Sequence, residues 1–352
     1  MSKYNQTLIA AAAGLVVPQR KLVRARTMDQ MYGGMQTFDR ATIDAAGAFL
    51  IGELERLDQE IHGPLAAFTW SRDINLREDV TLADDVSSFT RTEFAAPNGT
   101  AASAKSWIGR TTTAITGTGV DTQKIVTPLN LWGQELGWSV KELAASIQMG
   151  RPVDADKLRG LNFKFNMDVD AQVYVGDTGL GVTGLLNNPS VSVSNTQNGA
   201  SGSPLWTSKT PDEILADVNA ILNAAWAASA YTFVPTRLLV PPSSLSMLVS
   251  QKVSSAGNIS VLNYLKDNSL SNTVNGTPLE VLPVKWLETA GVGGTRRMVA
   301  YRKEHDKVRF PMVPMQRTPL EMRGILQMVT YYAALGGVEV VYPETMAYRD
   351  GI

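Results

Sequence analysis

The sequence predicts an α+β fold with more than one domain. Two kinds of pattern occur along its 352 residues. Apolar residues three to four positions apart predict helices, and short alternating runs predict strands. The clearest helix is predicted between residues 154 and 176, with an apolar stripe at Leu158, Leu161, Phe165, Val169 and Val173. Strand-like segments precede this helix and return at the C-terminus, so both kinds of element contribute to the fold.

The composition indicates a folded protein and excludes several kinds of site. Apolar residues make up 44% of the chain, which is enough for one large core or two smaller ones. The 32 basic residues nearly balance the 33 acidic ones, so the net charge of -1 gives no general attraction to nucleic acid or to a membrane. The absence of cysteine excludes disulfides, thiolate zinc sites and a cysteine nucleophile.

The first residues combine an apolar run, 8–17, with a basic run that contains Arg20, Lys21, Arg24 and Arg26. A secretory signal is an alternative, but such signals end in small residues at a cleavage site and not in a basic flank. We interpret the segment as an interaction arm. An amphipathic helix is predicted over 40–61, and the next strand is predicted at 86–91.

Residues 96–120 have an unusual composition. Seventeen of these 25 residues are Gly, Ala, Ser or Thr, and none is acidic. The segment has too few large apolar side chains to form a core of its own. Its Thr-rich run at 111–116 favours an extended hairpin. We therefore expect this segment to become ordered against a partner outside the subunit.

The next elements are predicted from their end signals. A strand is expected over 124–132, with Pro128 at an edge or a bulge. Ser139 and Glu142 form a capping box that begins a helix running to Met149. Residues 150–152 break the pattern, and Asp154 caps a second helix of about 22 residues.

An α/β segment is predicted in the second half of the chain. Thr210 and Glu213 form a capping box, and the apolar stripe after them predicts a helix that packs on a sheet. The strands of that sheet are expected at 237–242, 279–284 and 298–301. Asn275 and Gly276 predict a tight turn. Residues 325–334 and 338–342 are expected to form a hairpin around Leu335–Gly337.

The glycines Gly176, Gly179, Gly181 and Gly184 raise the question of a nucleotide site, because the last three have the spacing of a dinucleotide-binding loop. Such a loop requires a strand before it and a helix after it. Here a predicted helix precedes the glycines, and an Asn-Asn-Pro sequence and an alternating run follow them. We interpret the glycines as a flexible exit from the long helix.

No catalytic, metal or cofactor site is predicted. The only histidines, His62 and His305, are far apart in the sequence, and there is no zinc, nucleophile-elbow or phosphate-loop motif. The pairs Asp154/Asp156 and Asp168/Asp170 are expected to be solvated helix charges, because residues two apart on a helix point in different directions. The acids of 71–95 are likewise expected to form an exposed face. The methionines at 312, 315, 322 and 328 are expected to fill gaps in the core.

Three motifs carry a resemblance to a known family. They are Trp138–Leu143 (WSVKEL), the segment 170–187 with Val-Gly-Asp and then Gly-Leu-Leu-Asn, and Gly337–Pro343 (GVEVVYP). Together with the order of elements, they resemble the major capsid proteins of tailed bacteriophages, whose fold is shared with encapsulin shells.

The resemblance implies the following domains. Residues 1–65 would form an N-terminal arm and helix, and 66–120 an extended β-hairpin loop with its base. Residues 121–176 and 322–352 would form a peripheral domain with a long spine helix, and 177–321 an axial α/β domain. The four glycines would be the joint between the two domains. Subunit contacts would include Lys105, Trp107 and Arg110 in the loop and the four basic residues of the arm.

The implied function is structural. Subunits would assemble into hexamers and pentamers of an icosahedral phage head, in the host cytoplasm, around double-stranded DNA that is contacted only non-specifically. A separate scaffold protein or a processed N-terminus, a portal and a decoration protein are further expectations; a cofactor, a membrane and enzymatic activity are not expected. An encapsulin-type shell is the alternative within the fold, and a soluble β-rich enzyme is the alternative of another class.

Some capsids of this fold link a loop lysine covalently to a neighbouring subunit. That reaction requires a neutral amine in a desolvated site, and residues 102–106 provide little apolar cover for Lys105 apart from Trp107. We therefore expect a solvated lysine that binds acidic residues of a neighbour.

Deleting residues 98–117 is expected to abolish assembly while changing the thermal unfolding of the subunit little. The segment holds only Trp107, Ile108 and Ile115 as large apolar residues, so it contributes little to a core. Calorimetry and electron microscopy of the deletion variant measure the two effects. Full-sized shells from this variant would show that the loop is not needed between subunits.

Overall fold

The computed structural model describes residues 64–95, 117–149, 153–253 and 258–352. The chain divides into two units, Met1–Ala66 and Ala67–Ile352, and the description below concerns the second. The predicted arm and helix, His62, and the loop residues 105, 107 and 110 lie outside the described residues.

A six-stranded sheet is built around β13. Its full length pairs with β4 on one side, and β12 and β11 pair with its other side. β11 continues past β13 to pair with β1 in parallel and with β14 in antiparallel orientation. The strands are β1 (Asn75–Arg77), β4 (Asn130–Ser139), β11 (Val308–Arg317), β12 (Glu321–Arg323), β13 (Leu326–Leu335) and β14 (Glu339–Val340).

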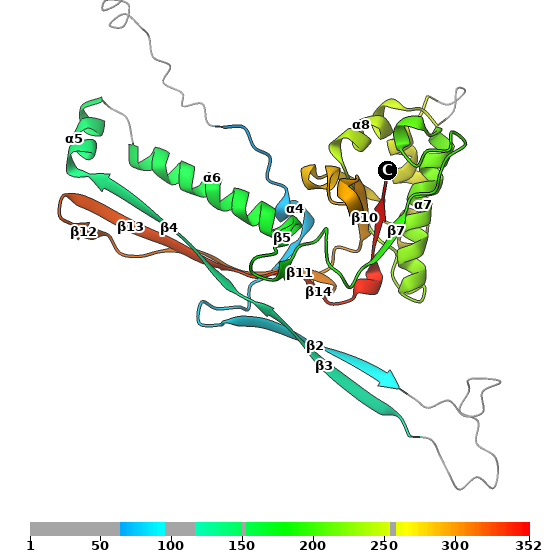
Figure 1. Cartoon of the computed structure of the whole chain (residues 1–352), viewed down its shortest axis with the longest axis horizontal. Coiled ribbons are helices and arrows are strands. Elements are labelled where there is room, and N and C mark those ends of the chain that lie inside the picture. Colours follow the sequence, from blue (N-terminus) through cyan, green and yellow to red (C-terminus); the bar gives the residue numbers. More distant parts are fainter. Residues whose placement is uncertain (1–63, 96–116, 150–152, 254–257) are drawn as a thin grey trace, which may run out of the picture. The chain divides into compact units, whose positions relative to one another are not determined.

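The long helix α6 (Val153–Tyr174) packs along this sheet (Figure 1). Its length of 22 residues agrees with the prediction. Leu161, Phe165, Val169 and Val173 of the predicted stripe are buried, and Phe165 stacks edge-on against Trp132 of β4 at 5.0 Å. Alternate residues of β4, Leu136 and Trp138 among them, face the helix. The period of two in β4 and the helical period of α6 thus create one shared core.

Helix α5 (Val140–Met149) begins directly after β4. The Ser139 hydroxyl accepts a hydrogen bond from the N–H of Glu142 at 3.0 Å, as the capping box predicts. The Glu142 carboxylate also binds Lys157 of α6 at 2.8 Å. This ion pair joins the ends of the two helices on either side of the break at 150–152.

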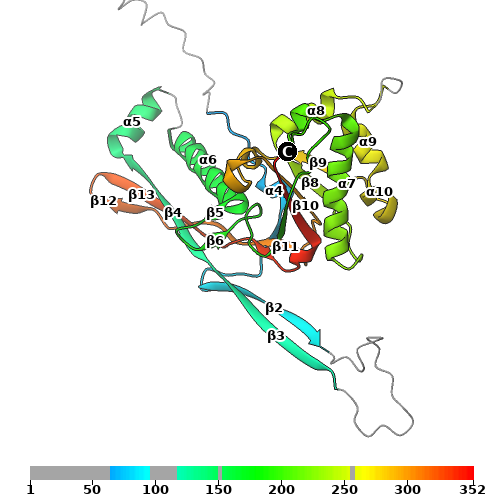
Figure 2. The same cartoon turned by 45° about the vertical axis from the view of Figure 1, so that its right-hand side comes forward.

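The second large sheet has five strands, in the order β7-β15-β10-β8-β9. Figure 2 shows helices α7, α9 and α10 beside it. The predicted stripe of α7 is buried on the sheet, and the Thr210–Glu213 capping box is complete. The elements are β7 (Ser192–Asn195), α7 (Pro211–Ala228), β8 (Arg237–Val240), α8 (Pro242–Ser250), α9 (Val261–Asn268), α10 (Leu270–Asn275), β9 (Glu280–Pro283), β10 (Arg297–Tyr301) and β15 (Met346–Asp350).

The two faces of this sheet serve different cores. Leu238, Met298 and Ala347 pack with α7, α8 and α9. Their neighbours in the strands, including Leu239 and Val299, belong to a core that also contains the end of α6 and residues of β11 and β13. Because both faces are covered, the strands are continuously apolar, which is why they were recognisable in the sequence.

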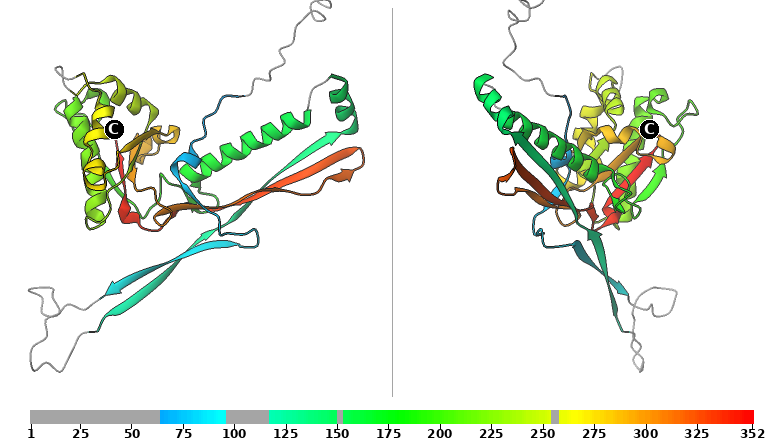
Figure 3. Two further views of the ribbon diagram at one scale, coloured as in Figure 1. Left: turned by 180° about the vertical axis from the view of Figure 1, so that it is seen from behind. Right: turned by 60° about the vertical axis from the view of Figure 1, so that its left-hand side comes forward.

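A two-stranded hairpin, β2 (Val86–Ala95) and β3 (Gly119–Pro128), pairs only with itself among the described strands. The register runs from Val86 opposite Pro128 to Ala95 opposite Gly119. In Figure 3, β3 leads directly into β4 while the hairpin itself lies apart from the two sheets. The described strands of this hairpin flank the segment 96–120 that was predicted to be extended, and most of that segment, 96–116, lies outside the described residues.

Several element predictions were wrong. The strand expected over 124–132 is two strands that change partner at Leu129: β3 pairs with β2, and β4 pairs with β13. The hairpin around Leu335–Gly337 does not form, because β13 and β14 both pair with β11 and not with each other. β15 joins the five-stranded sheet, and its residues Met346 and Tyr348 also pack in the core that contains the end of α6. The tight turn predicted at Asn275 and Gly276 is present: Gly276 ends α10 as a left-handed C-cap with φ +68°, shortly before β9.

Candidate assembly surfaces

A buried polar cluster centres on Asp73 in the short helix α4 (Trp70–Asp73). The Asp73 side chain is fully buried and accepts hydrogen bonds from Arg72 at 2.7 and 2.8 Å, from Arg237 of β8 at 3.3 Å, and from the Tyr174 hydroxyl of α6. The Tyr301 hydroxyl of β10 donates to the Asp73 carbonyl at 2.6 Å. One residue therefore ties the five-stranded sheet to the end of the long helix.

The tyrosines of this cluster are neutral hydrogen-bond donors. Burial, and then the Asp73 charge, raise the pKa of Tyr174 well above its ordinary value. The same two causes raise the pKa of Tyr301. Lys303 donates to the Arg72 carbonyl at 2.6 Å, and burial lowers its pKa. The cluster is fully hydrogen-bonded at its carboxylate, which is the condition under which a buried charge is tolerated.

A second carboxylate, Asp170 of α6, holds the segment before α4. Asp170 is buried and accepts from the Thr69 N–H at 3.0 Å and from the Trp286 indole at 2.8 Å, with Lys285 at 3.2 Å. Phe68 packs edge-on against Phe163 of α6 at 5.2 Å. The prediction that Asp170 is a solvated charge was wrong, as it was for Asp73, because partners from distant segments replace water. Asp168 and Asp156 remain partly exposed, and the Asp154 side chain lies outside the described residues.

The base of the hairpin is anchored by a third buried carboxylate, Glu339 of β14. It accepts from Arg309 of β11 at 2.7 Å, from Arg77 of β1 at 3.2 Å, and from the Ser87 hydroxyl of β2. Arg77 also donates to the Ser88 carbonyl at 3.0 Å. Two guanidinium groups thus surround one carboxylate. Through the hydrogen bond from Ser87 to this carboxylate, the first residues of β2 are fixed to the six-stranded sheet.

The four glycines form a compact cap on the end of α6. Residues 176–177 and 182–183 pair as β5 and β6. The N–H groups of Leu185 and Leu186 donate to the carbonyls of Val173 and Tyr174 at 2.7 and 3.0 Å. The Asn187 side-chain amide donates to the Val175 carbonyl at 2.7 Å. These bonds satisfy carbonyls that a helix end leaves unpaired, which favours a fixed exit from the helix over the predicted flexible one.

The geometry explains why glycine is required at particular positions. Gly176 has φ +73°, and a Cβ there would lie 2.4 Å from the Val182 carbonyl oxygen. A Cβ at Gly184 would lie 2.4 Å from the Tyr174 carbonyl oxygen. The chain after Gly184 continues through turns into β7 and not into a helix, so no helix N-terminus is available to bind a phosphate.

Residues just after the glycines are held by the five-stranded sheet. Arg297 of β10 donates to Asp350 of β15 at 2.6 and 2.8 Å and to the Leu186 carbonyl at 2.6 Å. The Tyr348 hydroxyl donates to the Leu185 carbonyl at 2.6 Å. The contacts of Arg297 with Leu186 and of Tyr348 with Leu185 were not predicted, because each joins segments more than one hundred residues apart in sequence.

The hairpin presents an outward face that lacks a partner in the described unit. Side chains alternate along each strand, and Ser87 and Arg91 face the subunit through Glu339 and Glu344. The opposite face of β2 and β3 exposes Phe94 by 78% and Val120 by 61%. Val86 and Val126 lie on the same face and are about half exposed. A two-stranded sheet with an exposed apolar face gains stability by packing on another surface.

A second apolar surface lies where β4 ends and α5 begins, and we call it the sheet-end patch. The Val140 N–H donates to the Ile325 carbonyl at 3.1 Å, which places the start of α5 beside the turn between β12 and β13. The exposed members of the patch are Val140, Ile147, Leu320, Met322, Ile325 and Leu326. Met322, expected in the core, is 60% exposed here, whereas Met312 is buried as predicted.

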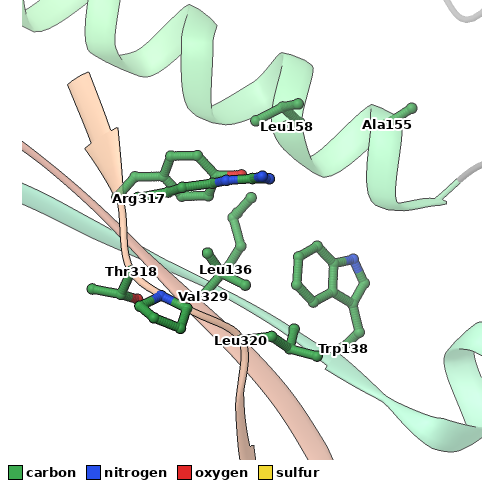
Figure 4. A pocket seen from close by; sticks show the side chains of 10 residues that line it. Leu136, Trp138, Ala155, Leu158, Arg317, Thr318, Leu320 and Val329 are labelled. Atoms are coloured by element: carbon green, nitrogen blue, oxygen red, sulfur yellow. The ribbon is translucent and has the colours of Figure 1, made fainter. Parts of the chain in front are cut away.

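The sheet-end patch borders an open pocket of about 550 Å³. Figure 4 shows Leu158 and Ala155 of α6 on one side and Leu136 and Trp138 of β4 on the other, with the Arg317 side chain reaching between them. The lining combines apolar side chains with the polar groups of Arg317, Thr318 and Tyr331. Among the described residues, no three His, Asp or Glu side chains lie close enough together to hold a metal ion. Nor is any described helix long and apolar enough for a bilayer.

Comparisons with known proteins agree with these features. A family model described as major capsid protein matches residues 103–352. The chain belongs to the major capsid protein family. No curated protein sequence matches the chain significantly.

Solved structures show the same fold. The capsid of Myoviridae phage XM1 aligns with a TM-score of 0.70 at 17% identity, over 86% of this chain and 98% of that chain. The capsid of a native GTA particle aligns with a TM-score of 0.58 at 14% identity, over 89% and 99%. The SrpI encapsulin of Synechococcus elongatus PCC 7942 aligns with a TM-score of 0.51 at 11% identity, over 86% and 95%.

The family and fold predicted from the sequence are therefore confirmed. The family match makes the protein a structural capsid protein, located in the capsid of the virion. The two surfaces that sequence reasoning missed, the outward hairpin face and the sheet-end patch, have only a weak signal in the sequence. Phe94 and Val120 stand in alternating strands, but their exposure depends on which face the rest of the subunit covers.

Proposed function

We propose that this major capsid protein forms the icosahedral head of a tailed bacteriophage as hexamers and pentamers enclosing double-stranded DNA. The observation that carries the proposal is the outward face of the hairpin, which exposes Phe94 and Val120 without a partner in the described unit. Contacts in which a surface of one subunit meets a different surface of the next close into rings. Two kinds of unpaired apolar surface, on the hairpin and at the sheet end, suit such head-to-tail contacts.

The four glycines and the residues after them are proposed to join the two domains of the subunit. Support comes from the hydrogen bonds between Leu185, Leu186 and the end of α6 and from the Arg297 contact to Leu186. The joint is held on both sides, so it would fix the angle between the spine helix and the five-stranded sheet. The basic residues Arg20, Lys21, Arg24 and Arg26 and the loop residues Lys105, Trp107 and Arg110 remain proposed contacts with neighbouring subunits.

The proposed partners are further copies of the chain, a separate scaffold protein, a portal and a decoration protein, with DNA contacted non-specifically. The protein is proposed to act without a cofactor and without enzymatic activity.

An encapsulin-type shell shares the fold, as the likeness to the SrpI encapsulin illustrates. Electron microscopy of purified particles separates these functions: DNA-filled heads with tails support the proposal, and small DNA-free shells that hold an enzyme contradict it. A stable monomer with substrate-dependent activity at high concentration would favour an enzyme.

Replacing Phe94 with glutamate is expected to abolish assembly without unfolding the subunit. The side chain is 78% exposed, so a charge there changes the free energy of unfolding by no more than about 0.5 kcal/mol. In an assembled shell the same charge would be buried in an apolar contact without a partner. Phe94→Leu, which keeps the apolar surface, is the control and is expected to assemble. Circular dichroism and negative-stain microscopy measure both effects, and normal shells from Phe94→Glu would contradict the proposed contact.

A further inference from the structure

We propose that the ion pair between Arg91 and Glu344 is a strut that holds the β2–β3 hairpin at one angle to the subunit, and that the hairpin pivots at its base when the strut opens. The proposal rests on the proposed function in one respect, namely that a second copy is what engages the hairpin. The strut itself is a property of the single chain. It sets the direction in which the outward face with Phe94 is presented.

The base of the hairpin has the features of a fixed pivot. Ser87 is bound to the buried Glu339, which is held in turn by Arg77 and Arg309. The other strand ends at Pro128, and the N–H of Leu129 donates to the Asp85 carbonyl at 3.0 Å. Both strands are therefore attached at the same end of the hairpin.

A small apolar cluster lies at the base of the hairpin, around Leu129. Leu129 packs against the buried residues Val80, Val313 and Ala334, apart from the main cores. Pro128 has no N–H to donate, and the next residue begins the change of partner from β2 to β13. The chain thus has a natural bending position between the hairpin and the six-stranded sheet.

Beyond the pivot, the hairpin is supported at a single charged contact. Arg91 lies four residues after Ser87, about 13 Å along the strand, and its guanidinium binds the Glu344 carboxylate. In the part of the chain that the structure describes, no other ion pair joins residues 89–95 or 119–127 to the rest of the subunit. Phe89, on the same face as Ser87 and Arg91, is partly buried closer to the pivot, and the ion pair supports the hairpin farther out.

The space around the strut is open. A pocket of about 510 Å³ lies between hairpin residues 90–94 and a surface formed by the end of α7 and residues 341–345. Side chains across such a space do not interlock, so the hairpin can change its angle without breaking a packed core. Next to this space, at Arg91, the ion pair is the contact that has to be exchanged for water or for a charge of another subunit.

The strut is weak enough to be opened. The Arg91 side chain is 29% exposed and the Glu344 side chain 37% exposed, so water and salt compete with the pair. A second copy that contacts the hairpin can therefore move it at small cost. Removing the strut should increase the displaced population by roughly 1.5- to 5-fold, the range that partly exposed ion pairs produce.

Distance measurements between two spin labels test the strut in the full-length, unassembled chain. The chain contains no cysteine, so Thr122→Cys on β3 and Asn223→Cys on α7 can be labelled specifically. Both positions are exposed, and Thr122 lies on the face of the hairpin away from Arg91. Arg91→Glu is expected to enlarge a second distance population, and high salt is expected to do the same in the parent protein. The double reversal Arg91→Glu/Glu344→Arg should restore the parent distribution.

Arg323→Glu is the matched control, because it breaks a partly exposed ion pair with Glu135 within the six-stranded sheet. It should leave the distances unchanged. An unchanged distribution in Arg91→Glu, or a double reversal that fails to restore it, overturns the strut. If Arg91→Glu loses its fold by circular dichroism, the neutral Arg91→Gln must show the shift, and no shift overturns the proposal. Because no assembly is measured, failure here leaves the capsid function standing, and failure of that function is seen by microscopy.

Discussion

Replacing Asp73 with alanine is expected to lower the free energy of unfolding by about 3–5 kcal/mol. The carboxylate is fully buried and binds Arg72, Arg237 and Tyr174. Without it, the Arg237 guanidinium, which is only 13% exposed, and the Tyr174 hydroxyl would lose a buried acceptor. Removing one partner of a buried ion pair costs more than the pair contributes, because the remaining charge stays desolvated. Urea unfolding followed by circular dichroism measures the change.

Asp79→Ala provides the control for this effect. Asp79 binds Arg77 at 2.7 Å, a distance equal to that between Asp73 and Arg72, but its side chain is 65% exposed. We expect a loss below about 1 kcal/mol, because water replaces an exposed partner. Equal losses for the two variants would show that burial of the Asp73 cluster does not determine its contribution.

Substitutions of the four glycines by alanine are expected to differ sharply within one short motif. Gly176→Ala should lower the free energy of unfolding by about 2–4 kcal/mol, since strain at positive φ adds to a clash with a backbone oxygen. Gly184→Ala should cost about 2–3 kcal/mol, because its Cβ would meet the Tyr174 carbonyl at 2.4 Å. Neither contact can be relieved by turning a side chain.

The other two glycines are controls within the same loop. Gly181 has φ +68° but open space around its Cβ, so Gly181→Ala should cost only about 1–2 kcal/mol of strain. At Gly179 the nearest atom is a side-chain oxygen of Asp177 at 3.2 Å, which can move, and we expect less than about 1 kcal/mol. Thermal unfolding of the four variants measures the order. Four equal and small losses would mean that the loop is a flexible linker after all.

The elements with strong local signals were predictable from the sequence. The capping residues Thr210 and Glu213 interact with backbone groups only three positions away, so the helix start does not depend on the rest of the fold. The apolar stripe of α6 follows from the helical period alone. The family resemblance rested on short motifs of this local kind, and the family match confirms it.

Strand pairing could not be predicted in the same way. Residues 325–342 look like a hairpin locally, yet β13 and β14 both bind β11, which is formed by residues 308–317. Pro128 correctly marked an irregular position, but only the structure shows that two strands with different partners meet there. Pairing depends on backbone groups that are distant in sequence, and each of them can bond to many alternative segments.

The sequence by itself determined the kind of protein, the capping residues that begin α5 and α7, the apolar stripe of α6 and the alternation at the start of β2. Only the tertiary structure decided which charges are buried and which apolar residues are exposed. Asp73, Asp170 and Glu339 carry the charge of ordinary surface residues but are buried, because arginine, tryptophan and tyrosine side chains from distant segments of the chain converge on them. Phe94 and Ile325 are apolar but exposed, because the faces on which they lie have no partner in the described unit. Burial depends on what the rest of the chain places against a residue, and no local pattern contains that information.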